Sequence, residues 1–203
     1  MKFNTTISRH LLLSKLKNYI VVAYLVQLVT GCSILKYENI PLAPVENNKI
    51  AVFDIDGTLT PNNIEIFTSR KDAAQAVTLF KNKGYQIVYL SARVKLLQAT
   101  IPNFLSSNNF PDGITLVPSS DDEQDQPDKF KIRVLNEFKT KGWTIAVAYG
   151  NSSTDFAAYE AVGIPQQNVF ALRKQGDSKC EQGKWNSCLT EWGKHLDAIL
   201  NKF

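Results

Sequence analysis

The hydrophobic residues of this chain follow two alternating patterns from residue 50 onward. Short apolar runs of strand length occur at 50–53, 86–90, 114–117, 144–149 and 169–172. Elsewhere apolar residues recur every three or four positions, which predicts helices at 72–81, 94–105, 130–138, 155–162 and 189–200. Strands that alternate with helices in this way predict an α/β fold, with a parallel sheet of about five strands and helices on both faces.

The patterned region, residues 50–203, has the length of a single domain. Only short segments separate the first strand from the next helix and the second strand from the third, so we expect a minimal cap or none over the sheet. Residues 32–49 contain Pro41 and Pro44 and show little periodicity, and we expect a tether there. The acidic run at 121–125 predicts a solvated loop.

The first 31 residues have the features of an export signal. Basic residues without any acidic residue precede an apolar run at 19–29, which is shorter than the roughly 20 residues that cross a bilayer. The run ends at Gly31 and Cys32, which resembles a bacterial lipobox with Cys32 as the lipidated residue, for example by palmitate. An uncleaved anchor and a plain signal cut near Gly31 are the alternatives. Each predicts a domain at the cell envelope of a bacterium, facing the periplasm or the exterior.

The charge of the chain bears on nucleic-acid binding, and its cysteines bear on disulfide formation. The net charge of +4 comes from Lys2, Arg9, Lys15 and Lys17 in the predicted signal, and the rest of the chain has equal numbers of basic and acidic residues. No basic patch predicts nucleic-acid binding. Cys180 and Cys188 remain after Cys32, and in an exported protein such a pair predicts a disulfide. A metal pair is the alternative, but it lacks nearby His or further Cys residues.

The sharpest chemical signal follows the first strand, where Asp54 and Asp56 stand one residue apart before Gly57 and Thr58. Two carboxylates this close resist ionising together unless a cation lies between them. Carboxylate oxygens suit Mg²⁺, which completes its octahedron with water and substrate phosphate. One aspartate can then act as nucleophile while the other transfers protons. The alternative is a strand that ends in an Asx turn, with both side chains capping backbone amides.

Further polar groups follow other predicted strands. Ser91, Ala92 and Arg93 follow the second strand, and a segment from Asn151 to Asp155 follows the fourth. Ligands of parallel sheets bind at the carboxyl ends of the strands, so we expect these groups to meet there. A lysine, Lys131 or Lys129, lies early in the helix before the fourth strand, where it opposes the helix dipole. Neutralising carboxylate and phosphate would give it a function, whereas a solvated lysine beside Phe130 is the alternative.

In this order the motifs resemble those of the haloacid dehalogenase (HAD) superfamily of phosphotransferases. The first motif is matched by 54–58, the second by Ser91, the third by the lysine and the fourth by Asn151 with Asp155. Finer details resemble the lipin-type phosphatidate phosphatases: Tyr-Leu-Ser-Ala-Arg at 89–93, Pro-Asp-Gly at 111–113, Phe-Lys-Ile at 130–132 and Gly-Asn-x-x-x-Asp at 150–155, followed by Ala-Tyr at 158–159. The Phe-Lys-Ile match favours Lys131 over Lys129.

The resemblance implies a role for each matched residue. Asp54 would attack phosphorus and form an aspartyl-phosphate, and Asp56 would protonate the leaving oxygen and then deprotonate water. Mg²⁺ would bind Asp54, the Asp56 backbone carbonyl and Asp155, with Asn151 as a further ligand. Ser91, Ala92 and backbone amides near Gly57 would bind phosphoryl oxygens, Lys131 would offset their charge, and Thr58 would orient the Asp56 loop. Arg93 would either contact the substrate or only brace the acidic loop. Many superfamily members have Asp where Asn151 stands, although the lipin-type branch has Asn.

We therefore expect a Mg²⁺-dependent phosphomonoester hydrolase, acting on phosphatidate or another lipid phosphate at a membrane. An open site without a large cap and a lipid anchor both favour such a substrate. A periplasmic phosphatase for nucleotides or other soluble phosphomonoesters is the second hypothesis. The lipin-type branch also includes domains that lost the first aspartate and only sense phosphatidate, so a non-catalytic binding module is the third. The presence of Asp54 favours catalysis. The sequence does not predict the oligomeric state.

Overall fold

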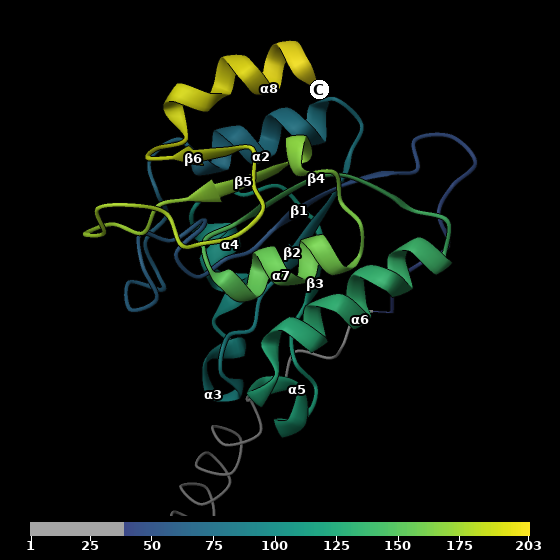
Figure 1. Cartoon of the computed structure of the whole chain (residues 1–203), viewed down its shortest axis with the longest axis horizontal. Helices are drawn as coiled ribbons and strands as arrows, with labels where there is room; N and C mark the ends of the chain where they lie inside the picture. The colour runs from purple at the N-terminus through teal and green to yellow at the C-terminus, as the bar shows by residue number, and fades with distance from the viewer. Residues whose placement is uncertain (1–38) are drawn as a thin grey trace, which may run out of the picture. The chain divides into compact units, whose positions relative to one another are not determined.

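The computed structural model describes residues 39–203. Its centre is a six-stranded parallel sheet with the strand order β3-β2-β1-β4-β5-β6. The strands are β1 Lys49–Phe53, β2 Gln86–Leu90, β3 Ile114–Leu116, β4 Thr144–Gly150, β5 Val169–Leu172 and β6 Ser187–Leu189. Helices cover both faces, with α2 and α8 above the sheet and α6 and α7 below it in Figure 1. The predicted α/β class and parallel sheet are confirmed.

One face of the sheet packs against α2 (Ala73–Asn82), α4 (Ile101–Ser107) and α8 (Leu196–Lys202). Alternate residues of each strand point to this face because successive side chains in a strand face opposite ways. The result is an aromatic core in which the Phe53 and Tyr149 rings stack at 5.2 Å, and Phe80 meets both edge-on. Trp192 is fully buried in the same core and donates its indole N–H to the Thr58 carbonyl at 3.2 Å. This core therefore supports the chain that follows β1.

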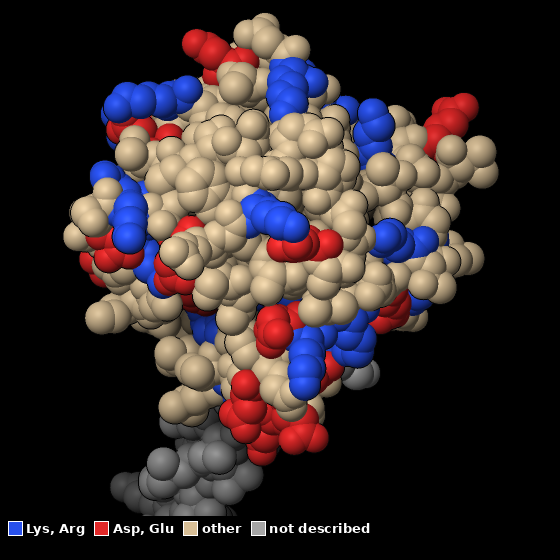
Figure 2. Space-filling view, viewed as in Figure 1, with Lys and Arg blue, Asp and Glu red and all other residues tan. Residues whose placement is uncertain are grey.

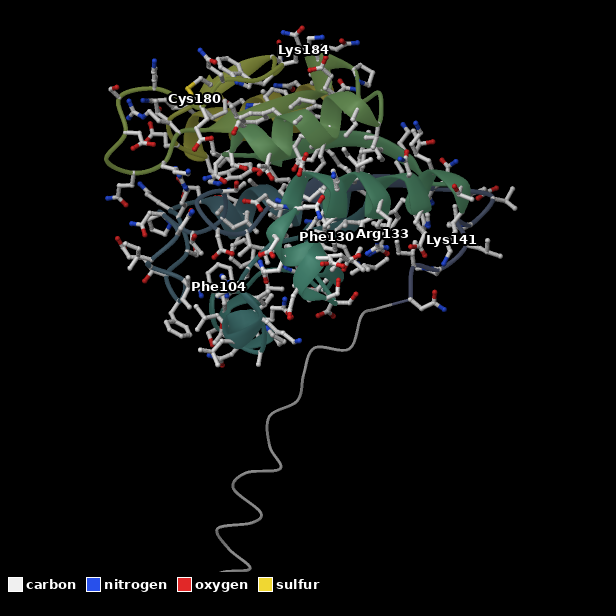
Figure 3. All side chains as sticks on the ribbon, turned by 60° about the horizontal axis from the view of Figure 1, so that its bottom comes forward. Phe104, Phe130, Arg133, Lys141, Cys180 and Lys184 are labelled. Carbon is white, nitrogen blue, oxygen red and sulfur yellow. A yellow bond between two sulfur atoms is a disulfide. The ribbon has the colours of Figure 1, made fainter. Side chains whose placement is uncertain are left out.

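The opposite face packs against α6 (Pro127–Thr140) and α7 (Ser153–Ala161). The buried residues of α6, Phe130, Val134, Leu135 and Phe138, recur at helical spacing, as the sequence predicts. Lys131 is also buried, one position after Phe130, so α6 directs a charged side chain toward the sheet. Arg133 lies outside this core, with its guanidinium 5.7 Å from the Phe130 ring (Figure 3).

The helix expected at 94–105 is two short helices, α3 (Lys95–Gln98) and α4. Pro102 has no N–H to donate to the carbonyl four residues earlier, so the first helix cannot continue through it. Instead, Pro102 occupies the first turn of α4, where a missing N–H costs nothing. Thr100 closes the junction by donating its hydroxyl to the Leu97 carbonyl at 2.6 Å.

Two other elements differ from the expectation. The acidic run predicted to be a loop forms α5 (Asp121–Asp125), because the Ser120 hydroxyl accepts a hydrogen bond from the Glu123 N–H at its N-terminus. The helix expected at 189–200 begins only with the 3₁₀ turn η2 (Gly193–His195) and α8, since Leu189 lies in β6. The predicted disulfide between Cys180 and Cys188 is present, and Cys188 lies in β6 beside β5.

The described part of the predicted tether packs onto the domain. Ile40 is buried with residues of α6 and the Trp143 side chain. Trp143 donates to the Pro41 carbonyl at 2.8 Å, and the Ala43 N–H donates to the Lys141 carbonyl at 2.8 Å. Figure 3 places Lys141 at the end of α6. The expectation of a free spacer is therefore wrong for residues 39–48, because one apolar residue without periodicity fills a gap beside α6.

The predicted signal at 1–31, the lipidated Cys32 and the start of the tether lie outside the described residues. Within residues 39–203 no helix is both long enough and apolar enough to span a bilayer. The described chain also forms no separate cap domain. At the carboxyl ends of the strands, the described chain places turns between β1 and α2, the short helices α3, α4 and α5, and the starts of α6 and α7.

Candidate active site

The turn after β1 positions the acidic pair. The Asp54 N–H donates to the Tyr149 carbonyl at 3.0 Å, which holds the end of β1 against β4. Three consecutive N–H groups, from Thr58 to Thr60, then donate to the Ile55 carbonyl. Gly57 lies at φ 83°, and a Cβ there would lie 2.3 Å from the Asn151 amide nitrogen. A glycine is therefore required at this position, both for the turn and for the close approach of β4.

Lys131 joins two carboxylates in the interior. Its Nζ lies 2.7 Å from Asp54 Oδ1 and also forms a short ion pair with Asp155 Oδ1. All three side chains are buried, and the lysine side chain is 3% exposed. Burying a charge is costly unless it is paired. One cation between two carboxylates leaves a net negative charge at the carboxyl ends of β1 and β4.

Burial and this net charge shift the pKa values of Asp54, Asp155 and Lys131. Burial, together with the nearby Asp155 carboxylate, raises the pKa of Asp54 to about 7, despite its contact with Lys131. Burial acts in the same direction on Asp155, but Lys131 and backbone N–H donors outweigh it and lower the pKa of Asp155. Burial opposes the charged form of Lys131, yet the two carboxylates raise its pKa. Asp54 is thus the group whose charge is least compensated.

The N-terminus of α7 holds Asp155. Its Oδ2 accepts hydrogen bonds from the backbone N–H groups of Asn151 and Ser152, at 3.0 and 2.9 Å. The Ser152 hydroxyl caps the helix by accepting from the Asp155 N–H, which completes a capping box. The local sequence therefore presents the second oxygen, Oδ1, to Lys131 and the site.

Several oxygens converge at the position where the sequence predicts a metal ion. One terminal atom of the Asn151 amide lies 3.0 Å from the Asp56 carbonyl oxygen and 3.1 Å from Asp54 Oδ2. With the amide nitrogen there, Asn151 donates to both oxygens; with the oxygen there, three oxygens meet and only a cation reconciles them. Oxygen ligands of this kind fit Mg²⁺. Among the described residues, no group of three or more His, Cys, Asp or Glu side chains is placed so that it could hold a metal ion by itself, so an ion here would also use the backbone carbonyl and the amide.

Asp56 is held by residues that follow β2. Arg93 donates from Nε to both carboxylate oxygens at 3.1 Å and from a terminal nitrogen to Oδ1 at 2.6 Å. Ser91 donates its hydroxyl to Asp56 Oδ2 at 3.0 Å. The Arg93 side chain is 2% exposed, and a further nitrogen donates to Thr100 at the α3–α4 junction. The two groups predicted to bind phosphate thus bind a carboxylate, an anion with similar donor requirements.

These groups surround a cavity of about 290 Å³ at the carboxyl ends of the strands. Its lining includes predicted site residues, namely Asp54, Asp56, Ala92, Arg93, Lys131 and Asn151. Three further predicted residues do not line the cavity but contact residues that do. Ser91 binds Asp56, Asp155 binds Lys131, and the Thr58 hydroxyl donates to Asp54 Oδ2 at 2.9 Å. Lys129, the alternative lysine, is exposed and donates to Gln126. The structure therefore brings together the residues predicted for catalysis, phosphate binding and metal binding, and it places Lys131, not Lys129, beside Asp54.

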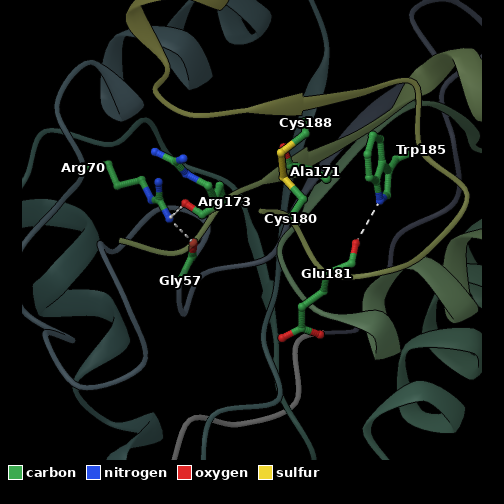
Figure 4. Close-up of a disulfide and its surroundings, with 8 residues drawn as sticks. All are labelled: Gly57, Arg70, Ala171, Arg173, Cys180, Glu181, Trp185 and Cys188. Atoms are coloured by element: carbon green, nitrogen blue, oxygen red, sulfur yellow. Dashed lines mark hydrogen bonds between the residues drawn. A yellow bond between two sulfur atoms is a disulfide. The ribbon is translucent and has the colours of Figure 1, made fainter. Parts of the chain in front are cut away.

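Arg70 is a supporting residue that the sequence pattern does not indicate. Its guanidinium donates to the carbonyls of Gly57 at 2.6 Å, Thr60 at 3.0 Å and Arg173 at 2.7 Å (Figure 4). Burial and the nearby Arg173 lower its pKa to about 10. Arg70 thus ties the turn after β1 to the end of β5. A single basic residue in a loop has no periodic or motif signal that would have identified it.

Glu181 is the second such residue. Its carboxylate accepts from the Ser153 N–H at the start of α7 and from Lys174 Nζ, each at 2.7 Å. The Trp185 indole donates to the Glu181 carbonyl at 3.1 Å (Figure 4). The disulfide segment therefore adds an acidic partner to the helix N-terminus that holds Asp155. Only the pairing of distant segments reveals this contact.

The domain resembles proteins whose names concern phosphatidate and phosphatidylinositol. A family model described as the LNS2 domain of PITM 1-3 matches residues 51–173. Human phosphatidate phosphatase LPIN2 is 28% identical, over 77% of this chain and 21% of that protein. Protein retinal degeneration B of Drosophila melanogaster is 32% identical, over 62% of this chain and 10% of that protein. Phosphatidate phosphatase PAH1 of Arabidopsis thaliana is 27% identical, over 64% and 17%. The chain thus spans about a fifth or less of the length of these relatives.

Solved structures agree on the fold. A D,D-heptose 1,7-bisphosphate phosphatase from B. bronchiseptica, complexed with magnesium and phosphate, has a TM-score of 0.52 at 10% identity, covering 76% of this chain and 99% of that one. A HAD-like phosphatase from Mesorhizobium loti has a TM-score of 0.50 at 14% identity, covering 81% and 88%. The resemblance predicted from the motifs is confirmed. Because the LNS2 model matches more than half of the chain, this protein belongs to the LNS2 domain family and has a HAD-like, lipin-type fold.

Proposed function

We propose that the domain hydrolyses phosphomonoesters, with Asp54 as nucleophile and a lipid phosphate such as phosphatidate as substrate. The observation that carries the proposal is the environment of Asp54. This carboxylate lines the cavity, shares one lysine with Asp155, and lies two residues from a second carboxylate. A merely structural carboxylate would gain nothing from an uncompensated negative charge nearby. The names of the lipin relatives support the substrate class.

The chemistry would proceed in two steps at phosphorus. An oxygen of Asp54 attacks phosphorus, the ester P–O bond breaks, and the leaving alkoxide takes a proton from Asp56. Water then attacks phosphorus, gives a proton to Asp56, and the P–O bond to Asp54 breaks, which releases phosphate. Lys131 offsets charge on Asp54 and on the phosphoryl oxygens throughout. These steps restore both aspartates.

Substrate binding would also free Asp56. Ser91 and Arg93 hold its carboxylate in the structure. A phosphate that accepted the Ser91 hydroxyl and an Arg93 N–H would compete with this contact, so Asp56 could turn toward the leaving oxygen. A Mg²⁺ held by Asp54, the Asp56 carbonyl, Asn151 and Asp155 would supply further charge neutralisation when bound.

Phosphate release tests the proposal. With Mg²⁺ present, the protein should release phosphate from p-nitrophenyl phosphate and from dispersed phosphatidate, and Asp54→Asn should lower the rate by at least about 10³-fold because it removes the nucleophile. Asp121→Asn, on exposed α5, is the matched control and should keep the rate. A thermal melt should show that Asp54→Asn is folded. Activity that survives Asp54→Asn would refute the nucleophile.

A non-catalytic lipid-binding module is the second candidate. It is favoured by the LNS2 match and by a relative named membrane-associated phosphatidylinositol transfer protein 3, which is not named as an enzyme. Such a module would bind phosphatidate-containing vesicles without releasing phosphate. A panel of lipid and soluble phosphates, run with the vesicle assay, separates this module, the lipid phosphatase and a phosphatase of soluble substrates.

We further propose that the chain is a lipid-anchored protein of the bacterial cell envelope. The support is the sequence of residues 1–32, with its basic start, apolar run and Cys32. Membrane fractionation and lipid labelling of Cys32→Ser test it. The protein should lose the label and leave the membrane fraction, or fail to be processed; unchanged labelling would refute lipidation at Cys32.

A further inference from the structure

Large apolar side chains are concentrated around the mouth of the active-site cavity. Residues 39–203 include seven large hydrophobic side chains that are clearly exposed. Four of these are Ile64, 88% exposed, Phe67, 59%, Val94, 52%, and Leu96, 89%. We call these four residues the apolar rim. Soluble domains rarely gather exposed apolar groups at one place without a binding partner.

The rim residues belong to the two segments that form one side of the cavity. Asn63 and Ile66, on either side of Ile64, line the cavity from the turns after β1, and Val94, directly before α3, and Leu97 of α3 line it from the second segment. Phe67 is in the first of these segments and Leu96 in the second. The rim therefore lies beside the cavity, along the two segments that contribute apolar residues to its lining.

Polar contacts hold the first of these segments in place beneath the rim. The Asn62 side chain accepts from the N–H groups of Ile64 and Glu65, at 2.8 and 2.9 Å. The Asn108 amide donates to the Phe67 carbonyl at 3.2 Å, which connects this segment to the end of α4. These backbone groups of the turn thus have partners within the protein, while the Ile64 and Phe67 side chains are exposed.

We propose that the apolar rim inserts into the surface of a lipid bilayer and places the cavity over the headgroup of a lipid phosphate. This inference rests on the proposed function and names the surface through which that function reaches its substrate. The cavity lining combines charged groups, such as the buried Asp54 and Lys131, with the apolar side chains of Ile66, Val94 and Leu97 from the two rim segments. A phosphate joined to hydrocarbon offers the same combination of a charged and an apolar part. A soluble sugar or nucleotide phosphate offers no apolar part for the rim.

The charge next to the rim determines the kind of attraction. Helix α5 carries exposed Asp121, Asp122 and Asp125, and Lys95 of α3 lies 3.8 Å from Asp121. Figure 2 shows acidic side chains gathered at the end of the domain where Figure 1 places α5, with basic side chains beside them. A surface with this acidic group is not a basic patch that would attract anionic lipids. Binding should therefore come from apolar insertion, and added salt should leave it unchanged or strengthen it.

Vesicle experiments on the full chain test the rim directly. The rim variant Ile64→Ser/Leu96→Ser removes the two most exposed rim side chains, neither of which lines the cavity. The control, Leu200→Ser, removes an exposed apolar residue of α8, 49% exposed. All proteins keep the same N-terminal segment, so differences between them report on the domain. The measurements are co-sedimentation with phosphatidylcholine vesicles, and turnover of p-nitrophenyl phosphate and of vesicle-borne phosphatidate.

We expect the rim variant to bind vesicles about tenfold less tightly and to hydrolyse vesicle-borne phosphatidate correspondingly more slowly, because it loses apolar area that the bilayer would bury. Its rate on p-nitrophenyl phosphate should stay within twofold, and Leu200→Ser should match the wild type in all three assays. In a second measurement, Phe67→Trp should gain fluorescence that brominated lipids quench, whereas Leu200→Trp should not.

The outcomes separate the rim from the proposed function. Quenching of Phe67→Trp in a protein that releases no phosphate would refute the phosphatase and keep the membrane contact. Phosphatidate turnover that is equal in wild type and rim variant, without quenching, would refute the rim and keep the phosphatase. Self-association that the rim variant abolishes, without vesicle binding, would identify a second copy as the occupant and refute the membrane proposal.

Discussion

Asp54 shows how one residue's environment sets its chemistry. Its pKa is raised to about 7 by burial and by Asp155, even though Lys131 lies 2.7 Å away. A carboxylate with such a pKa is half protonated near neutral pH, and a protonated carboxyl group is a poor nucleophile. Activity should therefore fall as pH drops through about 7 unless a bound cation or phosphate lowers the pKa. Polar neighbours alone do not keep Asp54 ionised.

The same pKa predicts a pH dependence of stability in metal-free protein. A carboxyl group that binds its proton more tightly in the folded state stabilises the fold below its unfolded pKa, and this contribution is lost as pH rises from about 4 through about 7. The Asp54→Asn variant lacks that titration. Urea unfolding in EDTA from pH 4 to pH 8 should therefore show the variant gaining stability relative to wild type as pH rises. A constant difference across this range would contradict the raised pKa.

Helix α7 shows how an element's terminus builds part of the site. Its capping box satisfies N–H groups that have no partner in the helix, and the same bonds orient Asp155. The cap is encoded locally by Ser152 and Asp155, three residues apart. Its neighbour, the disulfide segment, adds Glu181 from a distant part of the chain. Local and distant residues therefore act on the same helix end.

Ser152→Ala tests the cap. Loss of the hydroxyl should lower the free energy of unfolding by about 1 kcal/mol, the usual effect of removing an N-cap side chain. It also removes one of the three donors to Asp155 Oδ2, so phosphate release should decrease. Urea unfolding and p-nitrophenyl phosphate turnover are the measurements. Ser153→Ala is the matched control, because that residue is exposed one position further along, and equal effects of the two changes would contradict the cap.

For the whole molecule, the disulfide completes an otherwise weak edge of the sheet. β6 has only three residues and pairs with β5. Arg173, the residue directly after β5, accepts a hydrogen bond from Arg70 through its carbonyl. Cys180 is buried, while the Glu181 next to it contacts the start of α7. The disulfide therefore lies near two supporting contacts (Figure 4). One is the bond from Arg70 to the Arg173 carbonyl, and the other is made by Glu181, which binds the start of α7.

Breaking this link should destabilise the domain. Closing so short a loop contributes roughly 2–3 kcal/mol in the chain-entropy model, so Cys180→Ser/Cys188→Ser should lower the free energy of unfolding by about that amount. Dithiothreitol should have the same effect on wild type. The double variant is the control for the reductant and should not respond to it. A wild-type denaturation midpoint that reductant leaves unchanged would show that the link is not needed for stability.

The sequence by itself determined most of the fold, because the pattern of apolar side chains within a few residues indicates whether a segment forms a strand or a helix. Short apolar runs, together with apolar residues that recur every three or four positions, predicted the parallel sheet and its two covered faces. Asp54, Asn151 and Ser91 lie at strand ends, where parallel topology brings them together. A hydrophobic strand that stops at Asp54-Ile55-Asp56-Gly57 also predicts a site without any knowledge of packing.

Only the tertiary structure decided which groups meet. Lys129 and Lys131 are the same residue type and lie two positions apart. In α6, Lys131 faces Asp54, whereas Lys129 is exposed to solvent. Arg93 and Arg70 bind Asp56 and the Arg173 carbonyl, which lie on segments distant in sequence. Leu189, which the sequence pattern assigns to the last helix, instead ends β6 beside β5. These outcomes depend on contacts between distant segments, whose free energy local periodicity does not encode.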